Sequence, residues 1–403
     1  MKKLTKISLI ASLVMFAGTS STFADSSFDI TNPLSDLKIN GELRPRYEAV
    51  DVSNTKKDAD ALTLRTRIGL DSKLFNIDNL RFYTEVVNVT DSGDYNSLNN
   101  GNSSYNTIAD PSWTRLTQAY LDYSYEDTAL RVGRQAINLD NLRFVGTVNW
   151  RQMPQTFTGI TLTQKVDDLN LLASYLTKRH GIAEKFVTNT KSLVLHADYK
   201  LNDSHSLTGY GYLIGSASNT YGAFLKSKFD FNNIKLNTRI EYAVQKDATL
   251  SYDSLSKPEN DSSYYRVSLD ASKNGFFAGV GYEVLGHDSS NNKGFATPLA
   301  TLHAQNGWAD MFLGTPSEGL KDLTFKLGYK SKDFGKLMAV YHDYKADESS
   351  ISNDDIGSEL DVVYAKSLTK DIKLVLKMAD FKKGDVSSYN DSKKYWAMLN
   401  YKF

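Results

Sequence analysis

The chain has no cysteine, only seven prolines, and no long apolar stretch beyond its first residues. Without cysteine, no disulfide can hold the fold, and no lipid-anchor cysteine follows an export signal, which excludes a lipoprotein. Because proline cannot donate a backbone hydrogen bond to a neighbouring strand, its scarcity is compatible with many uninterrupted strands. Because no later segment has about eighteen consecutive apolar residues, membrane helices are excluded as well.

The first 24 residues have the three regions of a secretory signal peptide. Three lysines form a charged start, an apolar run extends from Ile7 to Gly18, and the small residues before Ala24 suit cleavage after that position. The apolar run is too short to cross a bilayer. We therefore expect residues 1–24 to be removed on export and residues 25–403 to form a single domain.

Apolar and charged residues alternate with period two along the first mature strand, residues 37–50. Leu43 and Tyr47 share one face, whereas Arg44 and Arg46 share the other. The next strand repeats this pattern, and tyrosine (24) and phenylalanine (19) are abundant, as strands prefer. In a soluble sandwich the apolar face would form the core; in a membrane barrel it would meet lipid, and the charged face would line a lumen.

The spacing of the strands separates these two readings. We predict eighteen strands of mostly about ten residues, at 37–50, 61–73, 79–88, 114–125, 128–134, 155–165, 169–178, 191–200, 206–215, 220–230, 234–246, 262–272, 275–285, 321–331, 335–346, 357–367, 371–380 and 393–403. Tight turns rich in Asn, Asp and Gly alternate with mostly longer loops. Short turns on one rim and long loops on the other are typical of an outer-membrane barrel. The sequence therefore predicts an all-β, antiparallel, up-and-down transmembrane barrel of eighteen strands, or alternatively sixteen, that forms a monomeric pore in a Gram-negative outer membrane.

The last strand ends the chain on an aromatic residue. Tyr395, Leu399, Tyr401 and Phe403 share one face of this strand. A terminal aromatic strand that ends in Phe resembles the signal read by the outer-membrane assembly machinery, and the alternative is an ordinary edge strand. The expected partners are this machinery, outer-membrane lipid and lipopolysaccharide, and small anionic solutes, with no nucleic acid.

The longest loops carry aromatic and basic residues. The loop at 135–154 and its flanks contain three arginines and three aromatic residues, namely Arg134, Arg143, Arg151, Phe144, Trp150 and Phe157. Aromatic residues indicate a loop packed against a wall, and arginines suit planar anions such as carboxylates. The loop at 286–320, with Pro298, His303 and Trp308, is expected to pack with the first and narrow the pore. The alternatives are an ordinary surface loop and an extracellular lid.

Ten of the thirteen arginines lie between Arg44 and Arg151. Alternation directs six of them, with interleaved glutamates, into the lumen: Arg44, Arg46, Arg65, Arg67, Arg81 and Arg131, with Glu42, Glu48 and Glu85. Fixed cations in a narrow aqueous tube attract anions over about 8 Å at physiological salt, so we expect net anion preference. The alternative is that these arginines pair with the glutamates and brace the wall.

Two stretches of the chain resemble the alginate-export family of outer-membrane porins. The first holds Gly133-Arg134-Gln135, Arg143-Phe144-Val145-Gly146 and Trp150-Arg151-Gln152; the second runs from Ala296 to Ala304, followed by Asn306-Gly307-Trp308-Ala309-Asp310. The resemblance implies an eighteen-stranded barrel with an arginine-rich pore for anionic, uronate-like polymers or smaller anions. One feature differs, because the tight turn at Leu368-Thr369-Lys370-Asp371 stands where the alginate exporter has a long periplasmic loop, and this argues against gated polymer export.

Three classes of function are consistent with a barrel. The first is a passive porin for small or oligomeric anions, with export of an anionic polysaccharide such as alginate as its alternative. The second is an outer-membrane lipase or protease, and the third is a structural or adhesive barrel with a closed lumen. None of the six histidines lies in a recognisable nucleophile motif, and no metal-binding motif occurs. We therefore expect no catalytic residue, no metal and no cofactor.

Overall fold

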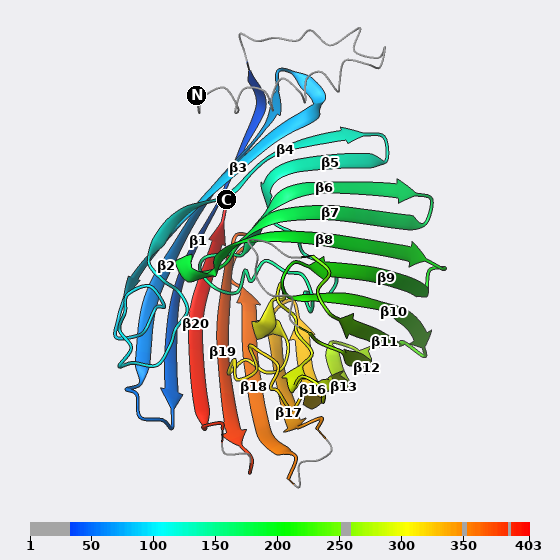
Figure 1. Ribbon diagram of the computed structural model, residues 1–403. Coiled ribbons are helices and arrows are strands. Elements are labelled where there is room, and N and C mark those ends of the chain that lie inside the picture. The colour runs from blue at the N-terminus through cyan, green and yellow to red at the C-terminus, as the bar shows by residue number, and fades with distance from the viewer. Residues whose placement is uncertain (1–32, 251–258, 349–352, 386–387) are drawn as a thin grey trace.

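The computed structural model describes residues 33–250, 259–348, 353–385 and 388–403. Within them, eighteen antiparallel strands form one sheet that closes on itself, because β1 pairs with both β2 and β20 (Figure 1). The prediction of eighteen strands is confirmed, and the alternative of sixteen is wrong. Closure leaves no unpaired strand edge, which a sheet in hydrocarbon requires because lipid cannot hydrogen-bond the backbone.

The barrel strands follow one another around the ring in chain order. They are β1 (Leu34–Val52), β2 (Ala59–Leu74), β3 (Ile77–Ser92), β4 (Trp113–Tyr125), β5 (Thr128–Gln135), β6 (Thr156–Val166), β7 (Leu169–His180), β8 (Val187–Lys200), β9 (His205–Ile214), β10 (Ser218–Phe231), β11 (Ile234–Lys246), β12 (Ser262–Lys273), β13 (Phe276–Leu285), β16 (Leu320–Ser331), β17 (Gly335–Lys345), β18 (Asp355–Ser367), β19 (Ile372–Lys383) and β20 (Ser392–Lys402). Two short strands, β14 (His287–Asp288) and β15 (Lys293–Gly294), and two 3₁₀ helices, Glu184–Phe186 and Leu302–Ala304, lie in the connections. Each predicted strand corresponds to one barrel strand, with boundaries that differ by at most four residues.

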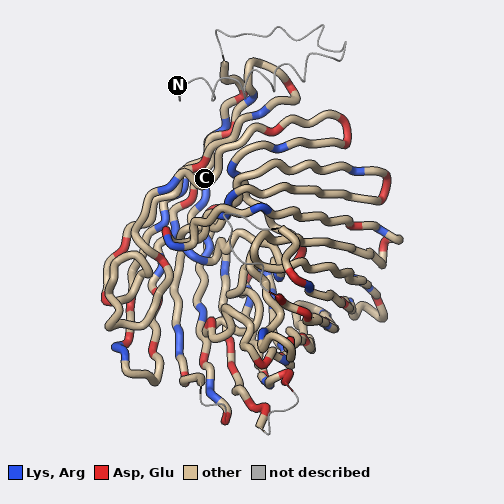
Figure 2. Tube along the Cα trace, viewed as in Figure 1, with Lys and Arg blue, Asp and Glu red and all other residues tan. Residues whose placement is uncertain are grey.

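The two faces of the strands differ as the alternation predicts. On β1, Leu43 and Tyr47 are 37% and 44% exposed on the outer face, whereas Arg44 and Arg46 are buried inside the ring. In Figure 2, β6 and β7 carry Lys or Arg only near one end, and β9 carries no Lys, Arg, Asp or Glu. Charge on the inner face is therefore unevenly distributed around the barrel.

The connections also sort by length as predicted. The short turns hold residues with positive φ, among them Asn76 (57°), Asp167 (51°) and Asn274 (50°). Tight hairpins need this conformation because its twist matches that of the flanking strands, and Asn and Asp tolerate it. The long connections, including 93–112, 136–155 and 286–319, begin and end at the other rim.

The predicted signal peptide, residues 1–24, lies outside the described residues, and the single mature domain stays a prediction. Among the described residues, no helix has both the length and the apolar character needed to span a membrane.

Candidate functional site in the barrel lumen

Two long connections lie inside the barrel and contact each other. We call residues 136–155 the first inward loop and residues 286–319 the second inward loop. The amide of Gly146 donates to the carbonyl oxygen of Leu299 (2.9 Å), and the amide of Thr301 donates to that of Leu142 (3.0 Å). The two loops are thus joined by backbone hydrogen bonds of the kind that join neighbouring strands. The expectation that they pack together is met by these contacts.

Aromatic residues attach the first inward loop to the barrel wall. The ring of Phe144 lies 5.2 Å from that of Tyr210 on β9 and 5.3 Å from that of Tyr264 on β12. Phe295 of the second inward loop joins the same cluster, and Phe157, at the start of β6, is fully buried. Since buried aromatic side chains remove large apolar areas from water, these contacts hold the loops in place.

Arginines and glutamates interleave on the inner face of β1 and β2. Arg65 pairs with Glu42, and Arg67 lies 3.7 Å from both Glu42 and Glu85. The register places Glu42 directly opposite Arg67, which brings opposite charges together across the strands. These arginines therefore pair with the glutamates and brace the barrel wall, which is the alternative to anion preference that the sequence left open.

The arginines of β1 hold the backbone of the first inward loop. Arg44 donates to the carbonyl oxygens of Asn149 (2.9 Å) and Arg151 (2.6 Å), and Arg46 donates to that of Trp150 (2.8 Å). Arg44 and Arg46 are 4% and 1% exposed. These side chains are covered by the first inward loop and are not open to the lumen, so they position that loop.

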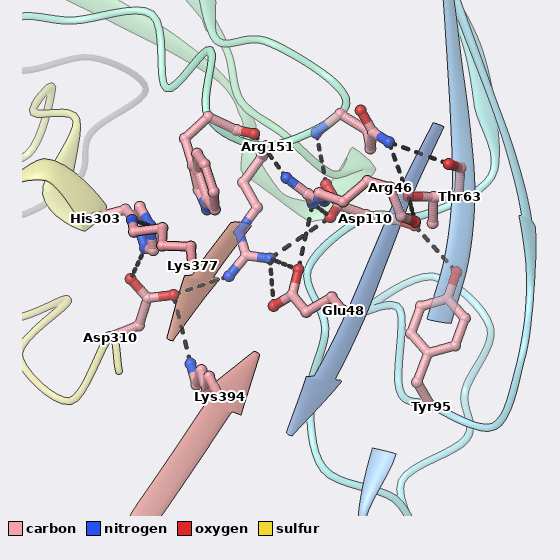
Figure 3. Close-up of polar contacts among 12 residues, drawn as sticks. Arg46, Glu48, Thr63, Tyr95, Asp110, Arg151, His303, Asp310, Lys377 and Lys394 are labelled. Carbon is pink, nitrogen blue, oxygen red and sulfur yellow. Dashed lines mark hydrogen bonds and ion pairs between the residues drawn. The ribbon is translucent and has the colours of Figure 1, made fainter. Parts of the chain in front are cut away.

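A chain of charged groups joins the inward loops to β1 and to its neighbour β20 (Figure 3). On one side, Arg46 pairs with Asp110, from the connection between β3 and β4. In the middle, Arg151 lies 2.9 Å from Glu48 of β1 and 2.8 Å from Asp310 of the second inward loop. The chain therefore links β1 with three long connections.

At the other end of this chain, Asp310 is bonded to both the second inward loop and the wall. It lies 2.7 Å from Nδ1 of His303 and 3.5 Å from Nζ of Lys394 on β20 (Figure 3). The neighbouring cations and the hydrogen bond from His303 hold the pKa of Asp310 well below its usual range despite burial. Burial lowers the pKa of Arg151, but the carboxylates of Glu48 and Asp310 outweigh it and raise that pKa above its ordinary value. Both groups are therefore charged at neutral pH.

Three of the four tryptophans surround the ammonium group of Lys377 on β19. Its Nζ lies 4.2 Å from the ring centre of Trp150, 3.7 Å from that of Trp308 and 5.3 Å from that of Trp396. We call these four residues the tryptophan cage. Trp150 and Trp308 come from the two inward loops, and Trp396 from β20, so the cation joins both loops to the wall.

His303 completes the contacts of this lysine. Nζ of Lys377 lies 2.6 Å from Nε2 of His303, whose ring stacks on Trp150 at 4.5 Å. Burial lowers the pKa of His303 to about 3, and Lys377 acts in the same direction against Asp310. The imidazole is therefore neutral at neutral pH, with Nδ1 donating to Asp310 and Nε2 accepting from Lys377.

Carboxylates on the inner face of β13, β16 and β18 bond the second inward loop. We call them the acidic wall, and they are Glu283, Asp322, Glu359 and Asp361. The amide of Ala309 donates to Glu359 (2.7 Å), and that of Trp308 donates to Asp361 (3.1 Å). Gly307 has φ +81° and lies against Glu359, where a Cβ atom would clash. The glycine lets the loop approach closely enough for these two hydrogen bonds.

The remaining predicted arginines lie in different surroundings. Arg143 is buried, 3.2 Å from Glu283 on the acidic wall. Arg81 lies 2.8 Å from Asp71 and Arg131 lies 2.6 Å from Asp122, both nearer the short-turn rim. Arg134 is three residues from Arg131, so it lies on the opposite face of β5, where it donates to the carbonyl oxygen of Leu116. Arg134 is thus apart from the group inside the ring.

A cavity of about 510 Å³ lies against both inward loops. Its lining includes Arg151, Gln155, Arg179, Phe186, Pro298 and His303. The lining combines apolar groups with a few converging polar ones, as small-molecule sites do. Among the described residues, no group of three or more His, Cys, Asp or Glu side chains could hold a metal ion.

Sequence reasoning missed several residues of this site. Asp110, Asp310, Lys377 and Lys394 all belong to the network but carry no local motif. Arg179 lies just beyond the predicted end of its strand. The one available signal was that Asp310 falls inside the second family-like stretch.

Comparisons with known proteins agree with this architecture. Residues 35–210 match the family model described as alginate export. No curated protein matches the chain by sequence. The family resemblance predicted from the sequence is thus confirmed over the residues that contain β1–β8, the first inward loop and most of β9.

Several solved structures share the fold at low sequence identity. The crystal structure of Acinetobacter baumannii OccAB1 is similar with a TM-score of 0.72 and 16% identity, over 92% of this chain and 97% of that one. Pseudomonas aeruginosa OpdO gives a TM-score of 0.70 and 14% identity, over 92% and 98%. A. baumannii OccAB4 gives 0.70 and 15%, over 93% and 99%. The chain therefore has the closed eighteen-stranded fold of outer-membrane porin barrels, and over residues 35–210 it resembles the alginate-export family.

Proposed function

We propose that the protein is a passive outer-membrane porin whose lumen favours anionic solutes such as carboxylates and uronate-like oligosaccharides. The observation that carries this proposal is a closed barrel with a charged inner face, narrowed by two loops that are braced from several sides. Such bracing suits a permanent constriction, because each loop is held by buried ion pairs and by cation–π contacts.

Inner-face cations support the preference for anions. Arg67 keeps 18% of its side chain exposed although it lies near Glu42 and Glu85, and Arg151 and Arg179 line the cavity against the loops. A guanidinium has five N–H donors, so one that already donates to a carboxylate can also donate to a second anion. Cations that line a pore in this way set its preference for anions.

The experiment is conductance of the refolded protein in a planar bilayer under a KCl gradient. The expected result is a stable conductance with a reversal potential of anion-selective sign. The double change Arg65→Ala with Arg67→Ala should shift the reversal potential toward cations, because it removes two positive charges from the inner face. Arg65→Lys with Arg67→Lys keeps the charge and serves as the matched control. Absence of conductance, or cation selectivity that the alanine pair does not change, would reject the proposal.

Export of an anionic polysaccharide is the second candidate within the same class, and the family match supports it. The connection between β18 and β19 is, however, only residues 368–371, so no long loop at this position can regulate polymer passage. The geometry therefore favours a passive channel.

An outer-membrane enzyme is the candidate from another class, and one contact bears on it. Nδ1 of His205 lies 2.8 Å from Oγ of Ser227. In the part of the chain that the structure describes, no carboxylate contacts the other ring nitrogen of His205, so the group that would orient a catalytic histidine is missing. Hydrolysis of lipid by the refolded protein would support this candidate over the porin.

A further inference from the structure

A second group of cations lies on the inner face at the short-turn rim of the barrel. Lys330 on β16 is directly opposite Lys336 on β17, close to the turn that joins these strands. Lys373 lies on β19 beside the turn at 368–371. We call Lys330, Lys336 and Lys373 the mouth lysines. This rim is periplasmic in outer-membrane barrels.

Strand alternation places the mouth lysines inside the ring. Lys330 has the parity of buried Asp322, Lys336 that of buried His342, and Lys373 that of buried Lys377. Residues of the opposite parity face outward, and Leu327, Leu337 and Leu376 are 65%, 42% and 42% exposed there. The three ammonium groups therefore face the aqueous lumen below the two inward loops.

The mouth lysines lack the carboxylates that accompany the arginines. Within the described ranges, none of the three forms an ion pair, whereas Arg81 and Arg131 are paired with aspartates. Lys326, one row above on β16, is paired with Asp270 at 2.6 Å. The positive charge of the mouth lysines on the β16–β19 side of the rim is thus not balanced by ion pairs within the described residues.

This arrangement is unfavourable for the sheet itself. Like charges directly opposite each other destabilise a strand pair, and Lys326, Lys330 and Lys373 all act electrostatically on Lys336. Between Lys336 and Lys373, the inner face of β18 carries only the small side chains of Ala365 and Ser367. The two ammonium groups therefore have space between them that an anion can enter.

We propose that the mouth lysines form a binding station for small anions with two or more carboxylates, and that they contribute more to anion preference than the paired arginines of β1 and β2. This inference rests on the proposed function and adds to it a site, a solute class and a side of the membrane. The ammonium groups of Lys330 and Lys373 are exposed, and that of half-buried Lys336 lies 5.5 Å from the centre of the Phe277 ring. Such a group of lysines binds an anion weakly, since each contact adds little and salt screens it. Weak binding suits a pore, in which the solute must leave as readily as it enters.

Citrate is the probe, because it presents three carboxylates. Added to one chamber of the bilayer and then to the other, it should reduce the KCl current of the wild-type channel from the short-turn side alone. In the variant Lys330→Gln, Lys336→Gln, Lys373→Gln, the half-blocking concentration should rise about tenfold, and the reversal potential should move toward cations. This movement should exceed the one caused by Arg65→Ala with Arg67→Ala.

The matched control removes the same charge from the same rim but not from the inner face. It is Lys332→Gln, Lys366→Gln, Lys370→Gln, because Lys332 and Lys370 lie in turns and Lys366 has the outward parity of β18. This variant should keep the citrate block of the wild type. Equal loss of block in both variants, or block retained without the mouth lysines, would overturn the binding station.

The outcomes also separate this inference from the proposed function. A wild-type channel that prefers anions and responds to the Arg65 and Arg67 changes, but not to loss of the mouth lysines, would remove the station and leave the porin. A wild-type barrel that does not conduct, or that prefers cations, would remove both. A denaturing gel with unheated samples confirms that each variant is folded, since folded barrels migrate differently from unfolded ones.

Discussion

The two basic regions of the lumen differ in how their charge is used. On β1 and β2, arginines lie against glutamates and loop carbonyls, and most are buried. On β16–β19, Lys330 and Lys373 are exposed and Lys336 lies over the ring of Phe277, and among the described residues the mouth lysines have no carboxylate partner. The first region holds the inward loops in place, whereas the positive charge of the second is not paired with carboxylates.

The comparison shows that the density of cations in a sequence does not measure the field inside a pore. Buried guanidinium groups need carboxylates and carbonyls to offset the loss of hydration, and this pairing cancels much of their charge. Exposed lysines remain hydrated without carboxylate partners. A few unpaired lysines can therefore produce a stronger electrostatic field in the lumen than a larger number of paired arginines. Although the arginines are concentrated in the first half of the chain, the mouth lysines are the better candidates for residues that set the preference for anions.

The largest effect should come from Asp110→Ala, in the paired region. This change leaves Arg46 and Arg151 buried without one of their carboxylates, so the free energy of unfolding should fall by about 3–5 kcal/mol. Urea unfolding in lipid vesicles, followed by tryptophan fluorescence, measures it. The control is Asp94→Ala in the same connection, where the exposed side chain should contribute less than about 0.5 kcal/mol. Equal effects of the two changes would contradict a braced network.

An intermediate effect should separate two lysines on the same face of β19. Lys377→Met removes the cation of the tryptophan cage and should lower the free energy of unfolding by about 2 kcal/mol. It should also increase the open-channel current noise, because both inward loops lose a common anchor.

Lys373→Met, four residues earlier, is the counterpart of that change. It should leave the free energy of unfolding within about 0.5 kcal/mol of wild type but move the reversal potential toward cations. The division of the lumen into a bracing and a selective region would fail if Lys373→Met destabilised the barrel and Lys377→Met alone changed selectivity.

The smallest effect should come from removing one complete ion pair near the rim. Arg131→Gln with Asp122→Asn keeps the net charge, and the two side chains are 34% and 24% exposed. The stability should change by less than about 1 kcal/mol, and the reversal potential should not change. A selectivity shift as large as that from the mouth lysines would show that paired charges also set the field.

Most of the fold could be predicted because its determinants are local. Alternation assigns Leu43 and Arg44 to opposite faces, and turn residues such as Asn76 and Asn274 mark where strands reverse. The site could be predicted only in part. Phe144, Trp150 and Arg151 stood out as unusual loop residues, and alternation indicated that Glu48, a partner of Arg151, faces inward. Their other partners, Asp110, Lys377 and Trp396, carry no sequence pattern.

The sequence by itself determined the inner and outer faces of the strands and the rim to which each connection belongs, because period-two alternation and turn chemistry act between near neighbours. It left eighteen and sixteen strands as alternatives, and the closed sheet decided for eighteen. Only the tertiary structure decided which cations are neutralised. Asp110 and Asp310 reach the same arginine from connections far apart in the chain, while no carboxylate of the described residues comes within ion-pair distance of Lys336. Coulomb interactions depend on distance in space, and closure of the ring sets that distance.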